Sequence, residues 1–234
     1  GASQLLPLAL MANHSFRLGT LLILIIFGGA MGSMLPMTLF LQQGFDFTPL
    51  QAGMTMAPFA AGVLVSSQVV RLFDGYSPRF RMATGALAYA AGMLALRFVI
   101  SGVEDEIFAP LFSAPLFLSG IGMNLCIATN FQSALFGVPA RDAGSGSGTM
   151  QAFQHLGSAF GIAIAGQIFF ATLDTQFAAG QGRHETYVTA LEMALIFNIC
   201  AFLAVALLSR FIIVPPTGGN TTAPTPAARL EPAD

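Results

Sequence analysis

The sequence of 234 residues has very little charge. Charged residues make up 9% of it, against about 25% in an ordinary soluble domain, and its mean hydropathy is +0.73. So few charges cannot cover a water-facing surface, which excludes a soluble enzyme, a soluble nucleic-acid binder and a disordered protein. The composition therefore predicts a membrane protein.

Lysine is absent and cysteine occurs twice. Without lysine, the phosphate-binding loop that ends in Gly-Lys-Ser/Thr cannot form. The net charge of −2 offers no basic patch for nucleic acid. Cys126 and Cys200 both lie in apolar runs without Cys-x-x-Cys spacing, so we expect packed side chains rather than a disulfide or a zinc site. No cofactor or metal is implied.

Long runs almost free of charge dominate what is present. A helix needs about 20 mostly apolar residues to cross a hydrocarbon core of about 30 Å. The alternation typical of barrel strands is absent, and a backbone in lipid must satisfy its own hydrogen bonds, which leaves helices. We predict an all-α membrane protein with six spans, at residues 18–42, 48–70, 79–101, 107–137, 143–172 and 187–213.

These spans divide the chain into three parts. Residues 1–17 form an interfacial lead-in, residues 18–214 the transmembrane bundle, and residues 215–234 a disordered tail rich in Pro, Ala and Thr. Arginines concentrate on one side of the predicted topology, which the positive-inside rule makes cytoplasmic for both termini. The arginines on that side are Arg17, Arg71, Arg79, Arg81, Arg141, Arg210 and Arg229.

A weak internal repeat relates the first three spans to the last three. Pro49-Leu50-Gln51-Ala52-Gly53 precedes the second span, and Pro139-Ala140-Arg141-Asp142-Ala143-Gly144 precedes the fifth, about 90 residues later. Because each copy holds three helices, the second copy is inverted in the membrane. Inverted three-helix repeats within a six-helix half are a feature of transporters.

Three stretches carry a more specific resemblance. They are Phe40-Leu41-Gln42-Gln43 followed by the Pro49 stretch and Pro58; Arg71-Leu72-Phe73-Asp74 followed by Pro78-Arg79; and the Pro139 stretch followed by Ser147-Gly148 and Gly157…Gly161-Ile162-Ala163. Together with the Leu5-Leu6-Pro7-Leu8 lead-in, they resemble the fourteen-helix drug:proton antiporters of the major facilitator superfamily. The resemblance runs from about Leu5 to Val214 and matches the C-terminal six-helix half.

The resemblance implies a half-bundle of a multidrug efflux pump in the cell's inner (plasma) membrane. Such a pump exchanges amphipathic compounds for protons by rocking two halves around a central cavity. The partner implied is an N-terminal half, together with the lipid bilayer, an amphipathic small-molecule substrate and protons. The alternatives are a symporter or uniporter of a small metabolite within the same superfamily, and a membrane scaffold that transports nothing.

His155 is the first candidate site residue. It lies eleven residues after Gly144, about 17 Å along a helix and so near the middle of the bilayer. Ionisable groups at that depth are costly, and histidine exchanges protons near neutral pH. Three roles stay open: proton coupling, contact with substrate, and a hydrogen bond to Gln151 one turn earlier that joins helices.

Other polar and soft side chains are candidates for the substrate cavity. Methionine suits a promiscuous apolar pocket, and polar side chains on one helical face suit either a cavity or a helix interface. Pro36, among the methionines, permits a bend in the first span. The cavity candidates are Met31, Met34, Asn124, Gln151, Gln154 and His155, with packing as the alternative for each.

Two further sets concern movement and packing. By resemblance, Arg71, Asp74 and Arg79 form a gating loop that latches one conformation, with a solvated turn as the alternative. Gly28-x-x-x-Gly32 and Gly157-x-x-x-Gly161 allow two helices to approach closely. Glu192, near the outer end of the sixth span, is expected to reach out to the membrane surface.

An intramembrane enzyme fits the sequence poorly. A Gly-x-Ser-x-Gly nucleophile motif would need serine at Gly146, and His155 is too far along the helix from Ser145 and Ser147 to act as their base. We therefore do not expect an enzyme.

Overall fold

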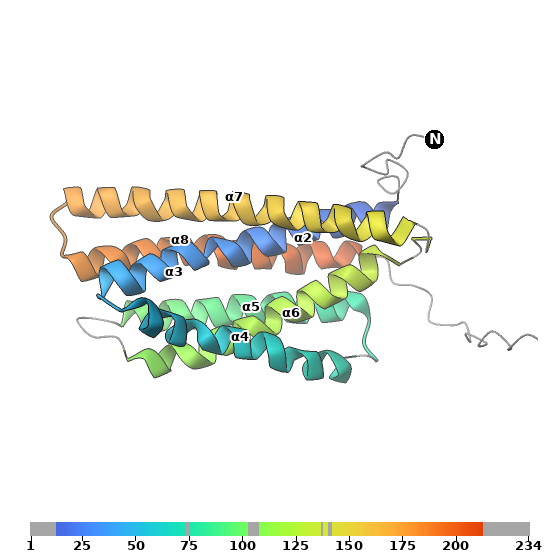
Figure 1. Ribbon diagram of the computed structural model, residues 1–234, viewed down its shortest axis with the longest axis horizontal. Helices are drawn as coiled ribbons and strands as arrows, with labels where there is room; N and C mark the ends of the chain where they lie inside the picture. The colour runs from blue at the N-terminus through green and yellow to red at the C-terminus, as the bar shows by residue number, and fades with distance from the viewer. Residues whose placement is uncertain (1–12, 74, 103–107, 137, 140–141, 213–234) are drawn as a thin grey trace, which may run out of the picture.

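A computed structural model describes residues 13–73, 75–102, 108–136, 138–139 and 142–212. Within these ranges the chain is helical, and six helical spans are long and apolar enough to cross a membrane. The spans run side by side along the long axis of the molecule (Figure 1). The predicted six-span, all-α fold is confirmed. The spans are His14–Gly44, Pro49–Leu72, Pro78–Ser101, Ala109–Ala134, Ala143–Ala178 and Arg183–Phe211.

The first span is interrupted. It consists of α2 (His14–Gly32), α3 (Met34–Leu39) and one π-helical turn, η1 (Phe40–Gly44), with a turn at Ser33 between the first two. Pro36 lacks a backbone N–H, so the carbonyl of Gly32 receives no helical hydrogen bond from it. The helix is thus interrupted at Ser33, about one turn before the proline.

Local signals begin the next two spans. In α4 (Pro49–Leu72), Thr48 before the helix and Gln51 in its first turn form a capping box, and in α5 (Pro78–Ser101) the Ser77 side chain caps the first turn. Proline at the first helical position costs nothing, because its missing N–H would have no helical partner there. These polar caps fix where the two helices begin.

The last three spans are η2 (Ala109–Phe112) with α6 (Ser113–Ala134), then α7 (Ala143–Ala178), then α8 (Arg183–Leu208) with η4 (Ser209–Phe211). Two of them extend beyond the prediction. The α7 helix passes Asp174 to reach Ala178, and α8 starts at Arg183 rather than at residue 187. A helix can continue into water beyond the hydrocarbon region. A run of apolar residues therefore indicates the length that lies in the membrane and does not show where the helix ends.

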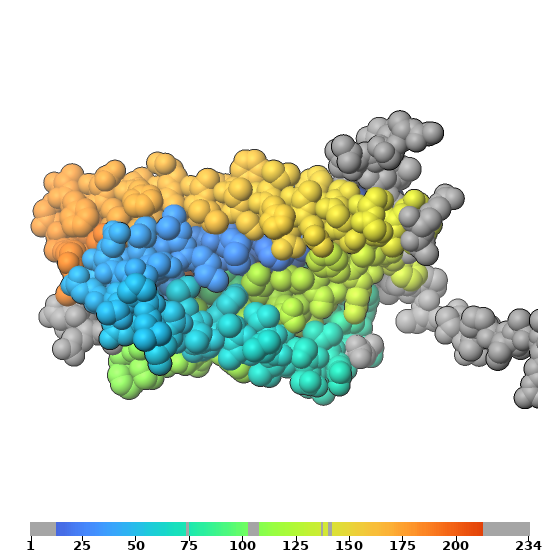
Figure 2. Space-filling model, viewed as in Figure 1, coloured from blue at the N-terminus to red at the C-terminus, as the bar shows by residue number. Residues whose placement is uncertain are grey.

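Helix packing follows the predicted inverted repeat. The first helix of each repeat packs on the second helix of the other: α2 on α7, and α6 on α4. The third helices, α5 and α8, pack on each other. This reciprocal pattern is what a pseudo-twofold axis produces. It places α7 and α4 at opposite edges of the bundle with α2 between them (Figure 2).

Glycine permits both of the reciprocal contacts. A Cβ on Gly161 of α7 would overlap the carbonyl oxygen of Gly28 on α2, and one on Gly120 of α6 would overlap the carbonyl oxygen of Phe59 on α4. Backbones approach this closely only where side chains are missing. The four glycines predicted to allow close approach, Gly28, Gly32, Gly157 and Gly161, all lie in the α2–α7 contact.

Candidate functional site

The two edge helices carry stripes of small and polar side chains that no other part of the described chain covers. On α7 the stripe lies in the half near the helix start, and a Cβ added to Gly144 or Gly148 would meet no atom within 4 Å. The exposed residues of the α7 stripe are Gly144, Gly148, Gln151, Ala152 and His155. We call these five residues the α7 stripe.

The matching stripe on α4 has the same character. It consists of Gly53, Ala57, Ala60, Ser67 and Gln68, all exposed, and is interrupted by Leu64. A Cβ on Gly53 would also meet nothing within 4 Å. We call these five residues the α4 stripe. Small residues and hydrogen-bonding groups are what transmembrane helices use to pack against other helices.

The opposite side of the bundle differs. There α5 and α8 expose large apolar side chains such as Leu94, Phe98 and Leu203, which are 41%, 68% and 42% exposed. Such side chains are suited to lipid. The α4 and α7 helices also expose large apolar side chains, such as Leu50 and Phe160, beside their stripes. The stripes of small and polar side chains, which α5 and α8 lack, are what fits a protein partner.

The structure separates the candidate cavity residues into three places. Gln151 and His155 belong to the exposed α7 stripe, and Gln154 is half-buried beside it. His155 makes no hydrogen bond or ion pair with any described residue, so the predicted bond to Gln151 is not formed. Asn124 lies on α6, where its Nδ2 donates to Ser66 Oγ of α4 at 2.6 Å. It therefore joins the two helices at the other edge of the bundle.

Met34 lines a small, nearly enclosed apolar pocket of about 30 Å³ inside the bundle. Three other methionines share this pocket: Met37, Met56 and Met93. Met31 instead packs against the hydrophobic core. Met37 follows Met31 and Met34 at the same spacing of three residues along the first span. The sequence interpretation did not single out Met56 and Met93, because only the fold brings α3, α4 and α5 around one space.

The gating loop is described in part. Asp74 lies outside the described residues. Arg71 is exposed at the end of α4, and Arg79 donates through Nε to the carbonyl oxygen of Ile212 at 2.6 Å. Phe73, Tyr76 and Phe80 of the same region form an aromatic cluster, with ring centres 5.1 to 6.3 Å apart. Arg79 thus ties the start of α5 to the end of the last span.

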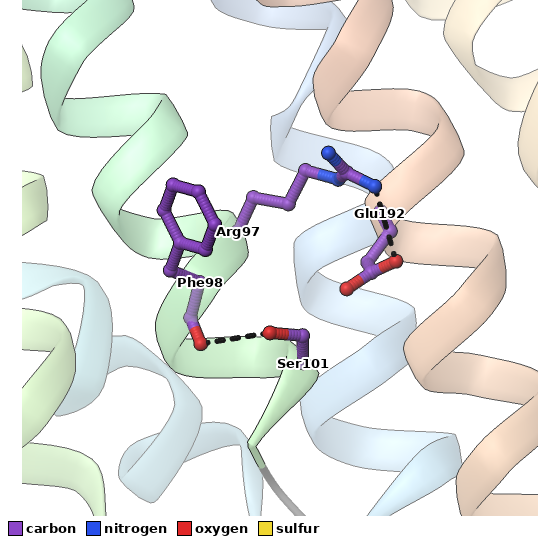
Figure 3. A network of polar contacts seen from close by, with 4 residues as sticks. All are labelled: Arg97, Phe98, Ser101 and Glu192. Atoms are coloured by element: carbon purple, nitrogen blue, oxygen red, sulfur yellow. Dashed lines mark hydrogen bonds and ion pairs between the residues drawn. The ribbon is translucent and has the colours of Figure 1, made fainter.

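The structure also reveals an ion pair that the sequence did not predict. Arg97 of α5 and Glu192 of α8 point toward each other, with Nη2 3.6 Å from a carboxylate oxygen (Figure 3). The Glu192 side chain is 16% exposed. Glu192 therefore pairs with Arg97 on the neighbouring helix, and its expected reach to the membrane surface stays a prediction. The sequence signal was one isolated charge in each of two apolar runs.

A second polar cluster closes the bundle at the same end. Arg183 at the start of α8 forms an ion pair with Asp46, which follows η1 and has a left-handed φ of 56°. Tyr187 donates a hydrogen bond to Gln43 at 3.1 Å, and His184 stacks on Phe45. These contacts hold the end of the interrupted first span against the last span.

Comparison with known proteins gives a consistent result. The model of the Major Facilitator Superfamily matches residues 2–162. The chain is 30% identical to the multidrug resistance protein Stp of Mycobacterium tuberculosis over 173 residues, which cover 74% of this chain and 31% of that protein.

Two Streptomyces proteins are also similar. The probable actinorhodin transporter of Streptomyces coelicolor is 29% identical over 81% of this chain and 34% of its own length. The puromycin resistance protein pur8 of Streptomyces alboniger is 27% identical over 84% of this chain and 41% of its own length. The chain thus spans about a third to two fifths of these relatives.

Proposed function

Because the chain belongs to the Major Facilitator Superfamily, we propose that it is the C-terminal half of a proton-coupled multidrug efflux transporter that works by alternating access. The observation that carries the proposal is the pair of stripes on α4 and α7, which flank α2 on one face and are covered by nothing in the described chain. Small and polar side chains there fit helices of an N-terminal half. The names of the relatives supply the substrate class.

In this proposal the substrate cavity forms between the two halves. An amphipathic compound would contact Gln151, Gln154 and His155 from α7, Asn124 from α6, and Met31 and Met34 from the first span. Burial of its apolar surface supplies most of the affinity, and the few polar groups orient it. His155 would exchange the coupled proton, because its exposed side chain has no hydrogen-bond or ion-pair partner among the described residues.

The gating loop would hold one of the two conformations. Arg71 and Arg79 lie at the ends of α4 and α5, where Asp74 joins them in sequence. Arg79 already bonds the end of the last span, so a change at this loop would be transmitted to α8. We place this end of the bundle in the cytoplasm, with both termini, in the inner membrane of the cell.

The first test is the mass of the native gene product, detected through an epitope inserted in residues 215–234. A product about twice the 24.5 kDa of this chain is expected. A product near 24.5 kDa would contradict the half-transporter and would require two copies of this chain to form a cavity.

The second test is efflux by the complete native protein in cells that lack other pumps. We expect accumulation of ethidium to fall on expression and to recover when an uncoupler removes the proton gradient. Asp74→Asn should abolish the effect, whereas Arg17→Gln, at the same end but outside the gating loop, should not. If the uncoupler left efflux unchanged, the result would contradict proton coupling. If the protein exported none of the amphipathic dyes, the result would favour a metabolite carrier or a scaffold.

A further inference from the structure

A groove of about 630 Å³ runs between α5 and α8, on the side of the bundle away from the stripes. It lies at the end where α5 begins and α8 ends, which is also where α2 begins. Its volume is in the range of small-molecule sites. It is lined by Ser77, Arg79, Phe80, Ala83, Leu87, Leu203, Ala206, Leu207, Ser209 and Arg210.

Positive charge gathers at one end of this groove. Arg79 and Arg210 are both exposed, and no acidic residue is among the described lining residues. Arg79 uses Nε for the Ile212 carbonyl, which leaves its two terminal nitrogens as donors. Arg210 makes no hydrogen bond or ion pair with its side chain inside the described ranges. The start of α5, capped by Ser77, adds the partial positive charge of a helix N-terminus.

The rest of the groove is apolar and extends along the helices. Leu87 lies nine residues into α5, about 13 Å from the helix start at 1.5 Å per residue. Leu203 faces the same groove from α8. A site with two guanidinium groups at the membrane boundary and leucines below them has the polarity profile of a phospholipid.

We propose that this groove binds an anionic phospholipid, with the phosphate on Arg79 and Arg210 and an acyl chain along Leu87 and Leu203. Arginine binds phosphate oxygens with two parallel hydrogen bonds, and basic pockets between helices at this boundary are suited to anionic headgroups. The apolar occupant must come from the bilayer, since α5 and α8 expose large apolar side chains on this side. The inference does not depend on the proposed transport function.

Native mass spectrometry of the complete gene product in detergent tests the proposal. The protein is titrated with phosphatidylglycerol and, separately, with phosphatidylethanolamine. We expect the first bound phosphatidylglycerol to be favoured over phosphatidylethanolamine. Each arginine near the surface contributes about a fivefold gain in affinity, so the Arg79→Gln/Arg210→Gln variant should lose about thirtyfold. Arg17→Gln removes an exposed arginine near the start of α2, at the same end of the bundle but outside the groove. This variant should leave phosphatidylglycerol binding unchanged.

A second variant tests the acyl-chain part of the groove. Ala83→Phe places a ring in the groove and should weaken phosphatidylglycerol binding several-fold, whereas Ala91→Phe, exposed two turns further along α5, should not. Circular dichroism of each variant confirms that it is folded.

Several results would overturn the proposal. They are equal binding of the two lipids, an unaltered double variant, loss of binding in Arg17→Gln, and inorganic phosphate that binds as tightly as the lipid. A several-fold gain in binding on removal of residues 215–234 would also overturn it, because the tail would then be the occupant.

Discussion

The two sides of this half-bundle present opposite surfaces to their surroundings. On one side, α4 and α7 expose two stripes of glycine, alanine and polar side chains beside large apolar ones such as Leu50 and Phe160. On the other side, α5 and α8 expose leucine and phenylalanine without such stripes. Both sides are apolar enough to lie in a membrane. Hydropathy alone therefore does not separate a surface suited to lipid from one suited to a protein partner, whereas a stripe of small and polar side chains marks the second kind.

The largest effect should come from enlarging a small residue on each side. We expect Ala152→Leu in the α7 stripe to reduce efflux by the complete protein at least tenfold, because the side chain enters a closely packed interface. Ala91→Leu is the matched change on α5, and it should leave efflux within twofold. Uptake of a fluorescent dye, normalised to the amount of protein in the membrane, measures both. Equal effects of the two variants would remove the distinction between the surfaces.

A substitution on the inner face of α7, which packs against α2, should lower the stability of the protein. Gly161→Ala would bring a Cβ onto the backbone of Gly28, and we expect it to destabilise the protein by about 1–3 kcal/mol. Gly166→Ala lies five residues later on the same helix, where the added Cβ would lie 3.6 Å from Leu35, an ordinary contact distance. This variant should leave the stability nearly unchanged. Thermal unfolding in detergent gives the comparison. If both variants unfolded at the same temperature, close approach of α2 and α7 would not be what Gly161 provides.

The Arg97–Glu192 ion pair joins α5 and α8, the two helices on the side of the bundle suited to lipid. Arg97→Gln or Glu192→Gln alone leaves one charge unpaired in a largely apolar region, at a cost of about 1–2 kcal/mol, between the values for exposed and buried pairs. The double variant should be more stable than either single one. The unfolding temperatures of the wild type, the two single variants and the double variant complete a double-mutant cycle. Strictly additive losses would mean that the two side chains act independently.

The smallest effect should be that of His155. Because the imidazole has no partner among the described residues and lies in the α7 stripe, we expect His155→Gln to flatten the dependence of efflux on pH between about 6 and 8. Efflux at pH 8 should change less than threefold. Asp174→Asn, further along α7 at its other end, serves as the control. Superimposable pH profiles for the wild type and His155→Gln would assign the residue to packing.

Much of the fold could be predicted, for reasons visible in single residues. Charges interrupt the apolar runs, so the six spans were predictable within a few residues, and Pro36 marked the interrupted first span. Helix ends outside the apolar run, such as Ala178, could not be predicted, because hydropathy carries no signal for where a helix ends in water. The glycine pairs were recognised as sites of close approach, but which helix each one faces depends on the tertiary arrangement.

The site was harder to predict than the fold. Gln151 and His155 were chosen for their polarity within an apolar run, and that signal led to an exposed stripe. Asn124 was chosen on the same signal, yet it bonds Ser66 on another helix. The pairing of Arg97 with Glu192 and the methionines around Met34 required knowing which helices are neighbours. The latch role of Asp74 remains a prediction.

The Arg97–Glu192 pair also has a consequence for biogenesis. Residue 192 follows residue 97 by 95 positions, which a ribosome covers in about 5 to 19 s at roughly 5–20 residues per second. During that interval α5 reaches the membrane with an arginine whose partner has not been synthesised. Until α8 arrives, Arg97 must be kept near water or shielded by the insertion machinery. The α8 helix therefore completes the charge balance of α5, and truncation before residue 192 would leave an inserted helix with an exposed cation.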